Sequence, residues 1–249
     1  MMDYFIICAA AFFAGILNTL AGGGTFLTFP ALSYIGIAPI MANATSAVAV
    51  FPGYLGGALG FRKELQSFER PALFRITLIT IIGGLIGSAL LLVSSDKVFS
   101  YIVPFLLLIA TAVFAFRERI LILTSRWGTS VKPYGIWGTL CVAIYGGYFN
   151  GGLGIVLLAL FSLWGMRDIN QMNGLKSGLS FVLSAISVII FSIAGIITWP
   201  HALAMMIAST IGGYLGAPIA RALPASIIRA VIIVIGCAMS AVFAVRAFS

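Results

Sequence analysis

The 249-residue chain is 61% hydrophobic and only 8% charged, with a mean hydropathy of +1.16. Soluble domains carry about 25% charged residues, so this composition excludes a soluble globular protein. The net charge of +8 does not indicate nucleic-acid binding, because the basic residues lie between apolar stretches and form no continuous patch. Membrane barrels show short segments of alternating polarity, which this sequence lacks. We therefore expect an all-α, polytopic membrane protein.

Ten apolar stretches follow one another, five on each side of a polar linker. The first five lie at about 4–21, 25–37, 41–61, 73–93 and 98–116, and the last five at about 134–149, 151–164, 177–198, 201–219 and 226–246. A helix needs about 20 apolar residues to cross the hydrocarbon core. We therefore expect eight to ten membrane segments, the second of each half being short or broken. Whether these two short segments cross the membrane fully stays open at this point.

The two halves match in sequence. G-G-L-I-G at 83–87 recurs as G-G-Y-L-G at 212–216, and T-A-V-F-A-F-R at 111–117 recurs as S-A-V-F-A-V-R at 240–246, both after 129 residues. The glycines have the small-residue spacing that lets membrane helices pack closely. We expect one integral membrane domain, 1–249, built by internal duplication: a first repeat at 1–117, a cytoplasmic linker at 118–132 and a second repeat at 133–249.

The basic residues orient the chain. If the linker is cytoplasmic, twelve of the fourteen Lys and Arg residues face inward and only Lys97 and Arg246 face outward, as the positive-inside rule expects. Corresponding loops of the two halves then lie on opposite sides, so the repeats are predicted to be inverted and both termini periplasmic. The N-terminus lacks the basic region of a secretory signal, and we expect it to form the first membrane segment.

A broken, polar stretch at 18–46 interrupts the apolar pattern, reading N-T-L-A-G-G-G-T-F-L-T-F-P and then G-I-A-P-I-M-A-N-A-T-S. Irregular backbone at membrane depth survives only where it is buried in protein or lines a cavity. Broken segments at matching places in inverted repeats indicate a secondary transporter with its site near the midplane. The candidate substrate-binding residues come from both breaks: Asn18, Gly22, Gly23, Gly24, Thr25, Asn43, Thr45, Ser46, Asn150, Gly151, Gly152, Gly154, Asn173, Lys176 and Ser177.

The acidic residues are few and lie at segment ends or in loops: Asp3, Glu64, Glu69, Asp96, Glu118 and Asp168. The single histidine, His201, is expected to start a helix, and no nucleophile–base set, metal cluster or phosphate-binding loop is visible. We therefore predict no catalytic residue, no metal and no cofactor. The three cysteines lie in apolar stretches without metal-site spacing and are expected to be buried thiols.

This shortage of acids also indicates the substrate. Transporters of cations or amines usually need a carboxylate in the membrane, whereas this chain offers hydroxyls, amides and Lys176. Segments starting near Thr25, Thr45, Gly154 and Lys176 would aim helix N-termini, which favour anions, into the site. An inside-negative potential is worth about 2.3 kcal/mol per charge per 100 mV, so an anion leaves the cell downhill. We predict a permease that exports a small anion by alternating access.

Each assignment has an alternative. Thr45 and Ser46 would also serve as caps of the third helix, Lys176 as an inside-facing snorkelling lysine, and Asn18 and Asn150 as ties for broken backbone. At the level of function, an anion-selective channel and a membrane subunit without transport activity stay open. The expected partners are the small anion and the lipid bilayer, without nucleic acid. The oligomeric state is open, a homodimer being one alternative.

The motifs resemble a known family. A-G-G-G-T-F-L-T-F-P-A-L, then G-I-A-P-I-M-A-N-A-T-S, with Y-G-G-Y-F-N-G-G-L-G-I in the second half, are similar to the sulfite exporter TauE/SafE family of bacterial permeases. The resemblance covers almost the whole chain. It implies a multi-pass protein of the bacterial inner membrane that moves sulfur-containing anions such as sulfite, sulfoacetate or other sulfonates. Family members often have G-A-G-x-G where this chain has Asn150-Gly-Gly-Leu-Gly, so the substrate stays open.

Overall fold

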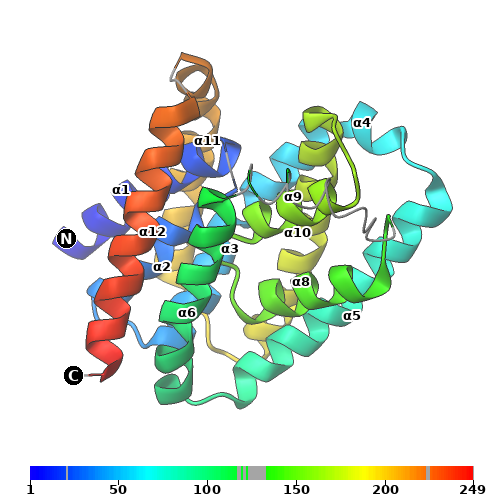
Figure 1. The fold of residues 1–249 in the computed structure, drawn as a ribbon. Coiled ribbons are helices and arrows are strands. Elements are labelled where there is room, and N and C mark those ends of the chain that lie inside the picture. The colour runs from blue at the N-terminus through cyan, green and yellow to red at the C-terminus, as the bar shows by residue number, and fades with distance from the viewer. Residues whose placement is uncertain (21, 117–118, 120–121, 123–132, 223–224, 249) are drawn as a thin grey trace.

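The computed structural model describes residues 1–20, 22–116, 119, 122, 133–222 and 225–248. These residues form helices with no strand among them (Figure 1), which confirms the all-α expectation. The first half contains α1 (Met2–Leu20), α2 (Thr25–Tyr34), α3 (Pro39–Gly60), α4 (Arg62–Gln66), α5 (Arg70–Val93) and α6 (Asp96–Ala115). The second half contains α8 (Ile136–Tyr148), α9 (Leu153–Leu163), α10 (Ile169–Ile193), α11 (Trp199–Ala222) and α12 (Ala225–Phe248).

Every apolar stretch of the sequence corresponds to one of these helices, and α4 is an addition within the basic loop after α3. The linker expected at 118–132 lies almost entirely outside the described residues. By length and composition, three helical segments among the described residues can cross a membrane: Arg70–Val93, Asp96–Val113 and Asn170–Ile193. Shorter apolar helices accompany them, at Met2–Asn18, Ile136–Tyr148, Leu153–Leu163 and Gly236–Val245.

The two short segments form half-length helices. Helix α2 has 10 residues and α9 has 11, so at 1.5 Å per residue each is about 15–17 Å long. This is about half of the roughly 30 Å of hydrocarbon in a bilayer. Neither helix alone is long enough to cross the membrane fully. They begin at Thr25 and Leu153, close to the starts that the sequence indicates.

Two other helices begin earlier than expected, so the expectation of helix N-termini near Thr45 and Lys176 was wrong. Helix α3 begins at Pro39, where the missing N–H of proline costs no hydrogen bond. Helix α10 begins after Asp168, whose carboxylate accepts two hydrogen bonds, at 2.8 and 3.3 Å, from backbone N–H groups of the first turn. Thr45 and Lys176 therefore lie inside their helices, and Thr45 and its neighbour Ser46 do not cap α3.

The helices pack mainly across the two halves of the chain. Helix α1 lies against α11, α5 against α8, α6 against α12 and α3 against α10. Helix α3 also contacts α11, and α10 also contacts α5. In Figure 1, α6 and α12 run side by side at the left of the molecule, whereas α5 and α8 form its lower right. The halves are thus interlocked, and neither buries its apolar faces by itself.

Glycines set the closest of these contacts. A methyl group added at Gly87 of α5 would lie 2.2 Å from the Ile144 carbonyl oxygen of α8. One added at Gly212 of α11 would lie 1.9 Å from the Phe12 carbonyl oxygen of α1. Backbone therefore meets backbone at both seams, which confirms that the repeated glycine motifs allow close packing. The surroundings of the last glycine of the second motif lie outside the described residues.

An aromatic cluster fills the space around α2. The Phe29 ring stacks on Phe243 of α12, with centroids 5.0 Å apart, and meets Phe99 and Phe149 edge-on at 6.1 and 5.6 Å. Phe29, Phe99 and Phe149 are fully buried. Edge-to-face pairs at these distances are the arrangement that aromatic rings favour. The cluster fixes α2 against α6 and α12.

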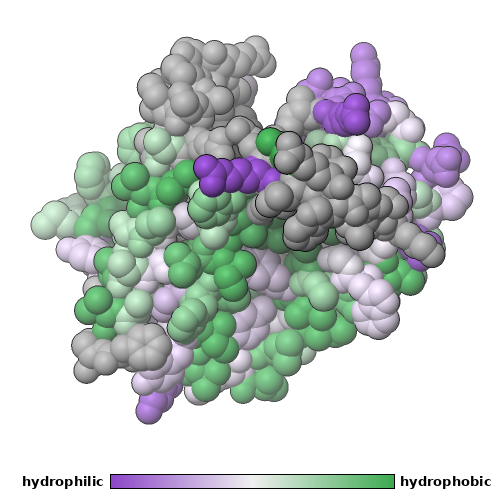
Figure 2. Space-filling view, viewed as in Figure 1, coloured by the Kyte–Doolittle hydropathy of each residue, from purple (hydrophilic) through white to green (hydrophobic). Residues whose placement is uncertain are grey.

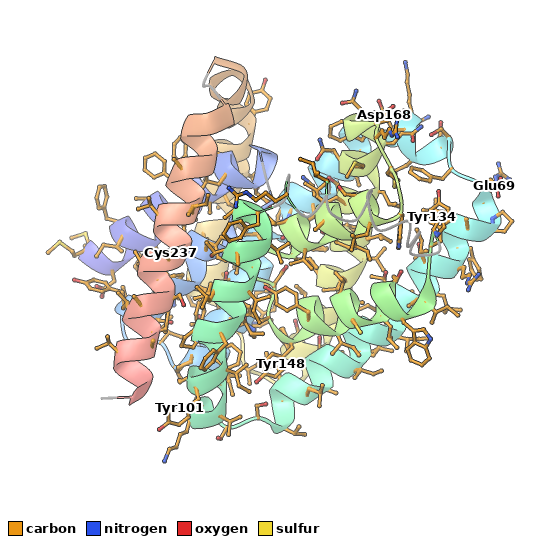
Figure 3. All side chains as sticks on the ribbon, viewed as in Figure 1. Glu69, Tyr101, Tyr134, Tyr148, Asp168 and Cys237 are labelled. Carbon is orange, nitrogen blue, oxygen red and sulfur yellow. The ribbon has the colours of Figure 1, made fainter. Side chains whose placement is uncertain are left out.

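Polar and apolar surfaces separate as a bilayer requires. Hydrophobic residues cover the middle of the visible face, and hydrophilic residues gather around α4 (Figure 2). Glu69 and Asp168 lie at this end of the molecule and Tyr101 lies toward the other (Figure 3). We call the end formed by residues 61–69 and 164–168 the Arg62 end. The end formed by residues 35–40, 94–97 and 194–199 is the Asp96 end.

The expectation of buried thiols was wrong for two of the three cysteines. Cys141 and Cys237 are exposed on α8 and α12, and Cys8 is partly buried. An apolar surface that faces lipid accepts a thiol as readily as a protein core does, so an apolar neighbourhood in the sequence does not separate the two places. Among the described residues, no group of His, Cys, Asp and Glu is arranged to hold a metal ion.

We expect Gly87→Ala to lower the melting temperature of the purified protein, because the added methyl group collides with the α8 backbone. Overpacking of this kind costs about 1–3 kcal/mol. Gly56→Ala is the matched control, since nothing lies within 4 Å of the position that its methyl group would take. Alanine also favours a helix over glycine by about 0.5–1 kcal/mol. Equal melting temperatures for the two variants would contradict the close packing of α5 on α8.

Candidate functional site

A cavity of about 890 Å³ lies between α1, α3, α10 and α11. Asn18 of α1, Tyr54 of α3, Asn173, Lys176 and Ser177 of α10 line it. A large part of the remaining wall consists of glycines: Gly15, Gly53, Gly56, Gly57, Gly60 and Gly213. Gly56 and Gly60 leave open space, since nothing lies within 4 Å of the position of an added methyl group, whereas a methyl group on Gly15 would lie 2.0 Å from the Ser209 carbonyl oxygen, so α1 and α11 touch there. The cavity extends along α3 to its last residue, at the Arg62 end.

Lys176 is the one charged side chain among the described residues that line this cavity. It is only 5% exposed, and its Nζ donates a hydrogen bond to the Asn173 Oδ1 at 3.1 Å. No carboxylate belongs to the described wall. The described wall thus combines one basic side chain with amides, hydroxyls and glycines.

The two glycine-rich breaks meet beside this lysine. A methyl group added at Gly22 would lie 2.9 Å from the Gly154 Cα, and one added at Gly154 would lie 2.9 Å from the Gly22 Cα. The same methyl group on Gly154 would lie 3.2 Å from the Lys176 Cδ. Gly22 also has φ +78°, a conformation that glycine adopts without strain. Two breaks more than a hundred residues apart in sequence are thus in backbone contact.

The N-terminal ends of the half-length helices lie at this contact. Gly24 is the residue before α2 and Gly152 the residue before α9, and a methyl group on Gly152 would lie 2.8 Å from the Phe26 ring in the first turn of α2. A helix N-terminus carries about half a positive elementary charge. Lys176 and two helix N-termini therefore place positive potential in one region. Gly23 and Gly151 lie in the same two breaks, next to Gly22 and Gly152 in the sequence.

Asn150 is held in a buried network that the sequence did not reveal. The Tyr54 hydroxyl of α3 donates to the Asn150 Oδ1 at 3.4 Å, and the Asn150 Nδ2 donates to the Ser184 Oγ of α10 at 3.2 Å. Both Tyr54 and Asn150 are almost fully buried. The Gly151 carbonyl accepts a hydrogen bond from the Tyr145 hydroxyl. Asn150 thus ties the second break to α3 and α10.

Asn43, Thr45 and Ser46 do not line the cavity and instead bond across helices. The Asn43 Nδ2 donates to the Tyr148 carbonyl oxygen at 3.0 Å, with the Asn43 Oδ1 buried and without a partner among the described residues. Thr45 and Thr198 share a hydroxyl–hydroxyl hydrogen bond of 2.9 Å. The Ser46 hydroxyl pairs with that of Thr28 of α2 at 2.5 Å.

Asn18 matches Asn150 in sequence but not in surroundings. Its side chain lines the cavity, and its Oδ1 is buried without a hydrogen-bond partner among the described residues. A methyl group on Gly53 of α3 would lie 3.2 Å from the Asn18 Nδ2, so the amide faces α3 across the cavity. Thr25, the first residue of α2, is buried. A buried amide oxygen without a partner is a group that a ligand or water can satisfy.

The structure therefore divides the predicted site into two groups. The first group lines the cavity and consists of Asn18, Asn173, Lys176 and Ser177. The second lies in the two breaks or bonds across helices, and consists of Gly22, Gly23, Gly24, Thr25, Asn43, Thr45, Ser46, Asn150, Gly151, Gly152 and Gly154. Sequence reasoning missed Tyr54, Ser209 and Thr210, which also line the cavity. The sequence marked each of them only as a polar residue inside an otherwise apolar membrane segment. One such residue is weak evidence for a binding site.

Comparison with known proteins decides the family. The family model described as sulfite exporter TauE/SafE matches residues 7–243. This chain belongs to the TauE/SafE family. The match spans both glycine-rich breaks and nearly all helices, so the whole described domain is a member, as the motifs indicated. No solved structure matches the chain significantly.

Curated relatives carry transporter names. A protein of Haemophilus influenzae named "Probable membrane transporter protein" is 26% identical over 95% of this chain and 92% of its own length. "Probable membrane transporter protein YfcA" of Escherichia coli strain K12 is 24% identical over 95% of this chain and 87% of its own length. "Probable membrane transporter protein ORF9" of Sinorhizobium sp is 25% identical over 93% and 88%, respectively. This TauE/SafE member is thus similar, over 93–95% of its length, to proteins named as probable membrane transporters.

The pair Asn18 and Asn150 allows a matched test of binding against structure. We expect Asn150→Ala to lower the free energy of unfolding by about 1–3 kcal/mol, because Tyr54 and Ser184 then lose their partner in a buried place. We expect Asn18→Ala to cost less than Asn150→Ala, because the Asn18 Oδ1 has no hydrogen-bond partner to leave unpaired among the described residues, while losing stabilisation by a bound ligand. Thermal unfolding with and without ligand measures both. An Asn150→Ala variant as stable as the unaltered protein would contradict the role of the network.

Proposed function

We propose that this chain is a secondary permease that exports a small anion from the bacterial cell by alternating access. The observation that carries the proposal is Lys176, a buried cation in the wall of a large cavity whose described lining residues include no carboxylate. A protein that binds a cation or an amine would place an acid there. Hydroxyl and amide groups of Ser177, Asn173 and Asn18 around the lysine are suited to an oxyanion.

The two halves act as inverted repeats in this proposal. Under the duplication, α1 corresponds to α8, α3 to α10, α5 to α11 and α6 to α12. Exchanging the halves turns the contact of α1 with α11 into that of α8 with α5, and the contact of α3 with α11 into that of α10 with α5. The contacts of α3 with α10 and of α6 with α12 map onto themselves. This correspondence supports a pseudo-twofold relation between the halves.

The difference between the two ends supports alternating access. Hydrogen bonds close the Asp96 end: the Ile40 N–H donates to the Asp96 Oδ1 at 3.0 Å, and Ser94 pairs with the Tyr148 hydroxyl at 3.3 Å. The hydroxyl–hydroxyl bond between Thr45 and Thr198 also ties α3 to this end. The cavity instead extends to the Arg62 end, where Gly60 is exposed. If the basic loops are cytoplasmic and both termini periplasmic, this is a conformation open to the cytoplasm, ready to take up an anion for export.

The substrate class in this proposal is sulfite or an organosulfonate. The family description names sulfite export, and a trigonal or tetrahedral sulfur oxyanion offers several acceptor oxygens to Lys176 and its neighbouring donors. The inside-negative potential drives such an anion outward without a coupled ion, at about 2.3 kcal/mol per charge per 100 mV. Two rival functions, an anion-selective channel and a membrane subunit without transport, give different results in the tests below.

Ligand-induced stabilisation tests the substrate and the lysine together. We expect sulfite or sulfoacetate to raise the melting temperature, since a ligand at about a hundred times its Kd adds roughly 2.7 kcal/mol. Lys176→Gln should lose this shift, whereas Arg167→Gln, outside the cavity wall, should keep it. Sulfate, phosphate, short carboxylates and divalent metals complete the panel. Stabilisation by a metal or amine alone would overturn the anion site.

Cross-linking tests alternating access. Thr45→Cys and Thr198→Cys replace hydroxyls that are 2.9 Å apart, in a background where Cys8, Cys141 and Cys237 are changed to serine. We expect the disulfide to stop uptake of labelled substrate into proteoliposomes and reduction to restore it, because the Asp96 end can then open again. Single-cysteine variants are the control. Transport that continues through the cross-linked protein, or unitary currents in a planar bilayer, would favour a channel.

A further inference from the structure

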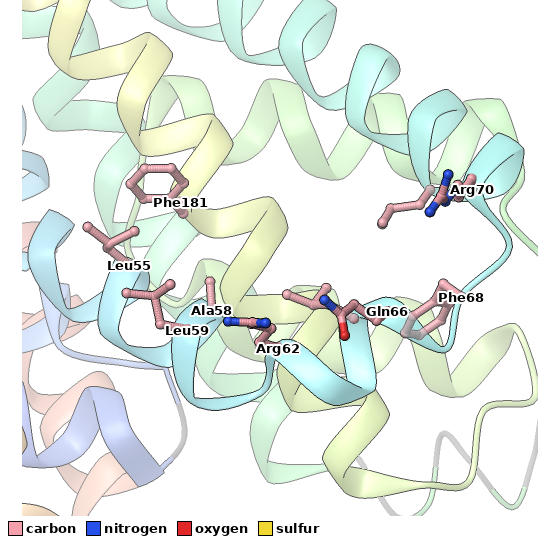
Figure 4. Close-up of a pocket in the computed structure, with 10 residues that line it drawn as sticks. Leu55, Ala58, Leu59, Arg62, Gln66, Phe68, Arg70 and Phe181 are labelled. Atoms are coloured by element: carbon pink, nitrogen blue, oxygen red, sulfur yellow. The ribbon is translucent and has the colours of Figure 1, made fainter.

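A second cavity, of about 670 Å³, lies at the outer side of α3 near the Arg62 end. Leu55 and Leu59 of α3 and Phe181 of α10 form its apolar wall, and Arg62, Gln66 and Arg70 lie toward the loop (Figure 4). It shares no lining residue with the cavity that contains Lys176. Since Leu55 and Leu59 are 41% and 64% exposed, the groove is open to the surroundings of the protein rather than to its centre.

The charge of this groove has one sign. Two guanidinium groups, those of Arg62 and Arg70, line it, and no carboxylate does. Within the part of the chain that the structure describes, neither guanidinium makes an ion pair or a hydrogen bond. The nearby Glu64 of α4 packs on α10 instead, with its Cβ 3.4 Å from the position of a methyl group on Gly174. The arginines are thus available to an anion from outside.

The groups follow one another in the order that a lipid molecule has. Leu55 and Leu59 lie on successive turns of α3, about 6 Å apart along its axis at 1.5 Å per residue, and Arg62 begins α4 just after α3 ends. Apolar side chains therefore lie toward the membrane interior, and the cations lie at the polar end. A small soluble anion would bind the arginines but make no contact with the exposed leucines. An uncharged apolar ligand would contact the leucines but leave the two arginines without a partner among the described residues.

We propose that this groove binds an anionic phospholipid, with its head group between Arg62 and Arg70 and an acyl chain lying along Leu55, Leu59 and Phe181. On the topology proposed above, the groove faces the cytoplasmic leaflet, whose anionic lipids attract basic side chains. Arginine suits this task because its planar guanidinium donates two parallel hydrogen bonds to one phosphate. The bound lipid would hold α4 between α3 and the start of α5, close to the cytoplasmic mouth of the permease.

Native mass spectrometry of the full chain in detergent tests the proposal, with phosphatidylglycerol and phosphatidylcholine of identical acyl chains as probes. We expect tighter binding of phosphatidylglycerol. The Arg62→Gln and Arg70→Gln double variant should bind it about thirtyfold more weakly, since each basic group near an anionic surface contributes about a factor of five. The matched control is the Lys63→Gln and Arg75→Gln double variant, which removes the same charge outside the groove and should keep the affinity.

Three results would overturn the proposal. The first is equal binding of the two lipids, and the second is an equal loss of phosphatidylglycerol affinity in both double variants. The third is displacement of phosphatidylglycerol by glycerol phosphate at the concentration at which the lipid itself binds, because the acyl chain would then contribute nothing to the affinity. Ala58→Trp gives an independent check, because it fills the apolar wall and leaves both arginines in place; we expect it to weaken phosphatidylglycerol binding as well. The melting temperature in phosphatidylcholine confirms that each variant is folded.

Discussion

The contact between Gly22 and Gly154 is the constraint on which the rest of the structure depends. Two chain segments that lack continuous helix can lie together at membrane depth only if their backbone groups are enclosed by protein. Glycines at the contact allow the backbones to approach, and the half-length helices α2 and α9 then begin side by side. This arrangement gathers two helix N-termini next to the buried Lys176.

Much of this arrangement could be predicted from the sequence, because membrane helices are specified by hydrophobicity and length. The all-α class, the apolar segments, the short second and seventh of them and the glycine seams were readable. The starts of α3 and α10 were not, because Asn43, Thr45, Asn173 and Lys176 were interpreted as interruptions. Polar residues inside a membrane helix do not end it when its backbone hydrogen bonds remain intact and neighbouring helices supply partners for the side chains.

The candidate site shows a second limit of sequence reasoning. Asn18 and Asn150 hold equivalent places in the duplicated motif, yet one lies at the cavity with an unpartnered oxygen and the other is fixed by Tyr54 and Ser184. A duplicated sequence predicts two equal environments. The cavity lies beside Asn18, whereas Asn150 is bonded to α3 and α10, so the fold gives the two asparagines different surroundings. Which residue of a duplicated pair lies at the cavity is therefore known only from the coordinates.

The exchange of partners between the halves has a consequence for assembly. Helix α1 packs on α11, which is synthesised only after nearly the whole chain has left the ribosome, whereas α5 meets α8 much sooner. Since synthesis proceeds from the N-terminus at about 5–20 residues per second, α1 waits in the bilayer for many seconds with the face around Gly15 uncovered. The first half therefore cannot mature as an independent unit, and lipid or the membrane insertion machinery must shield that face until the last helices arrive.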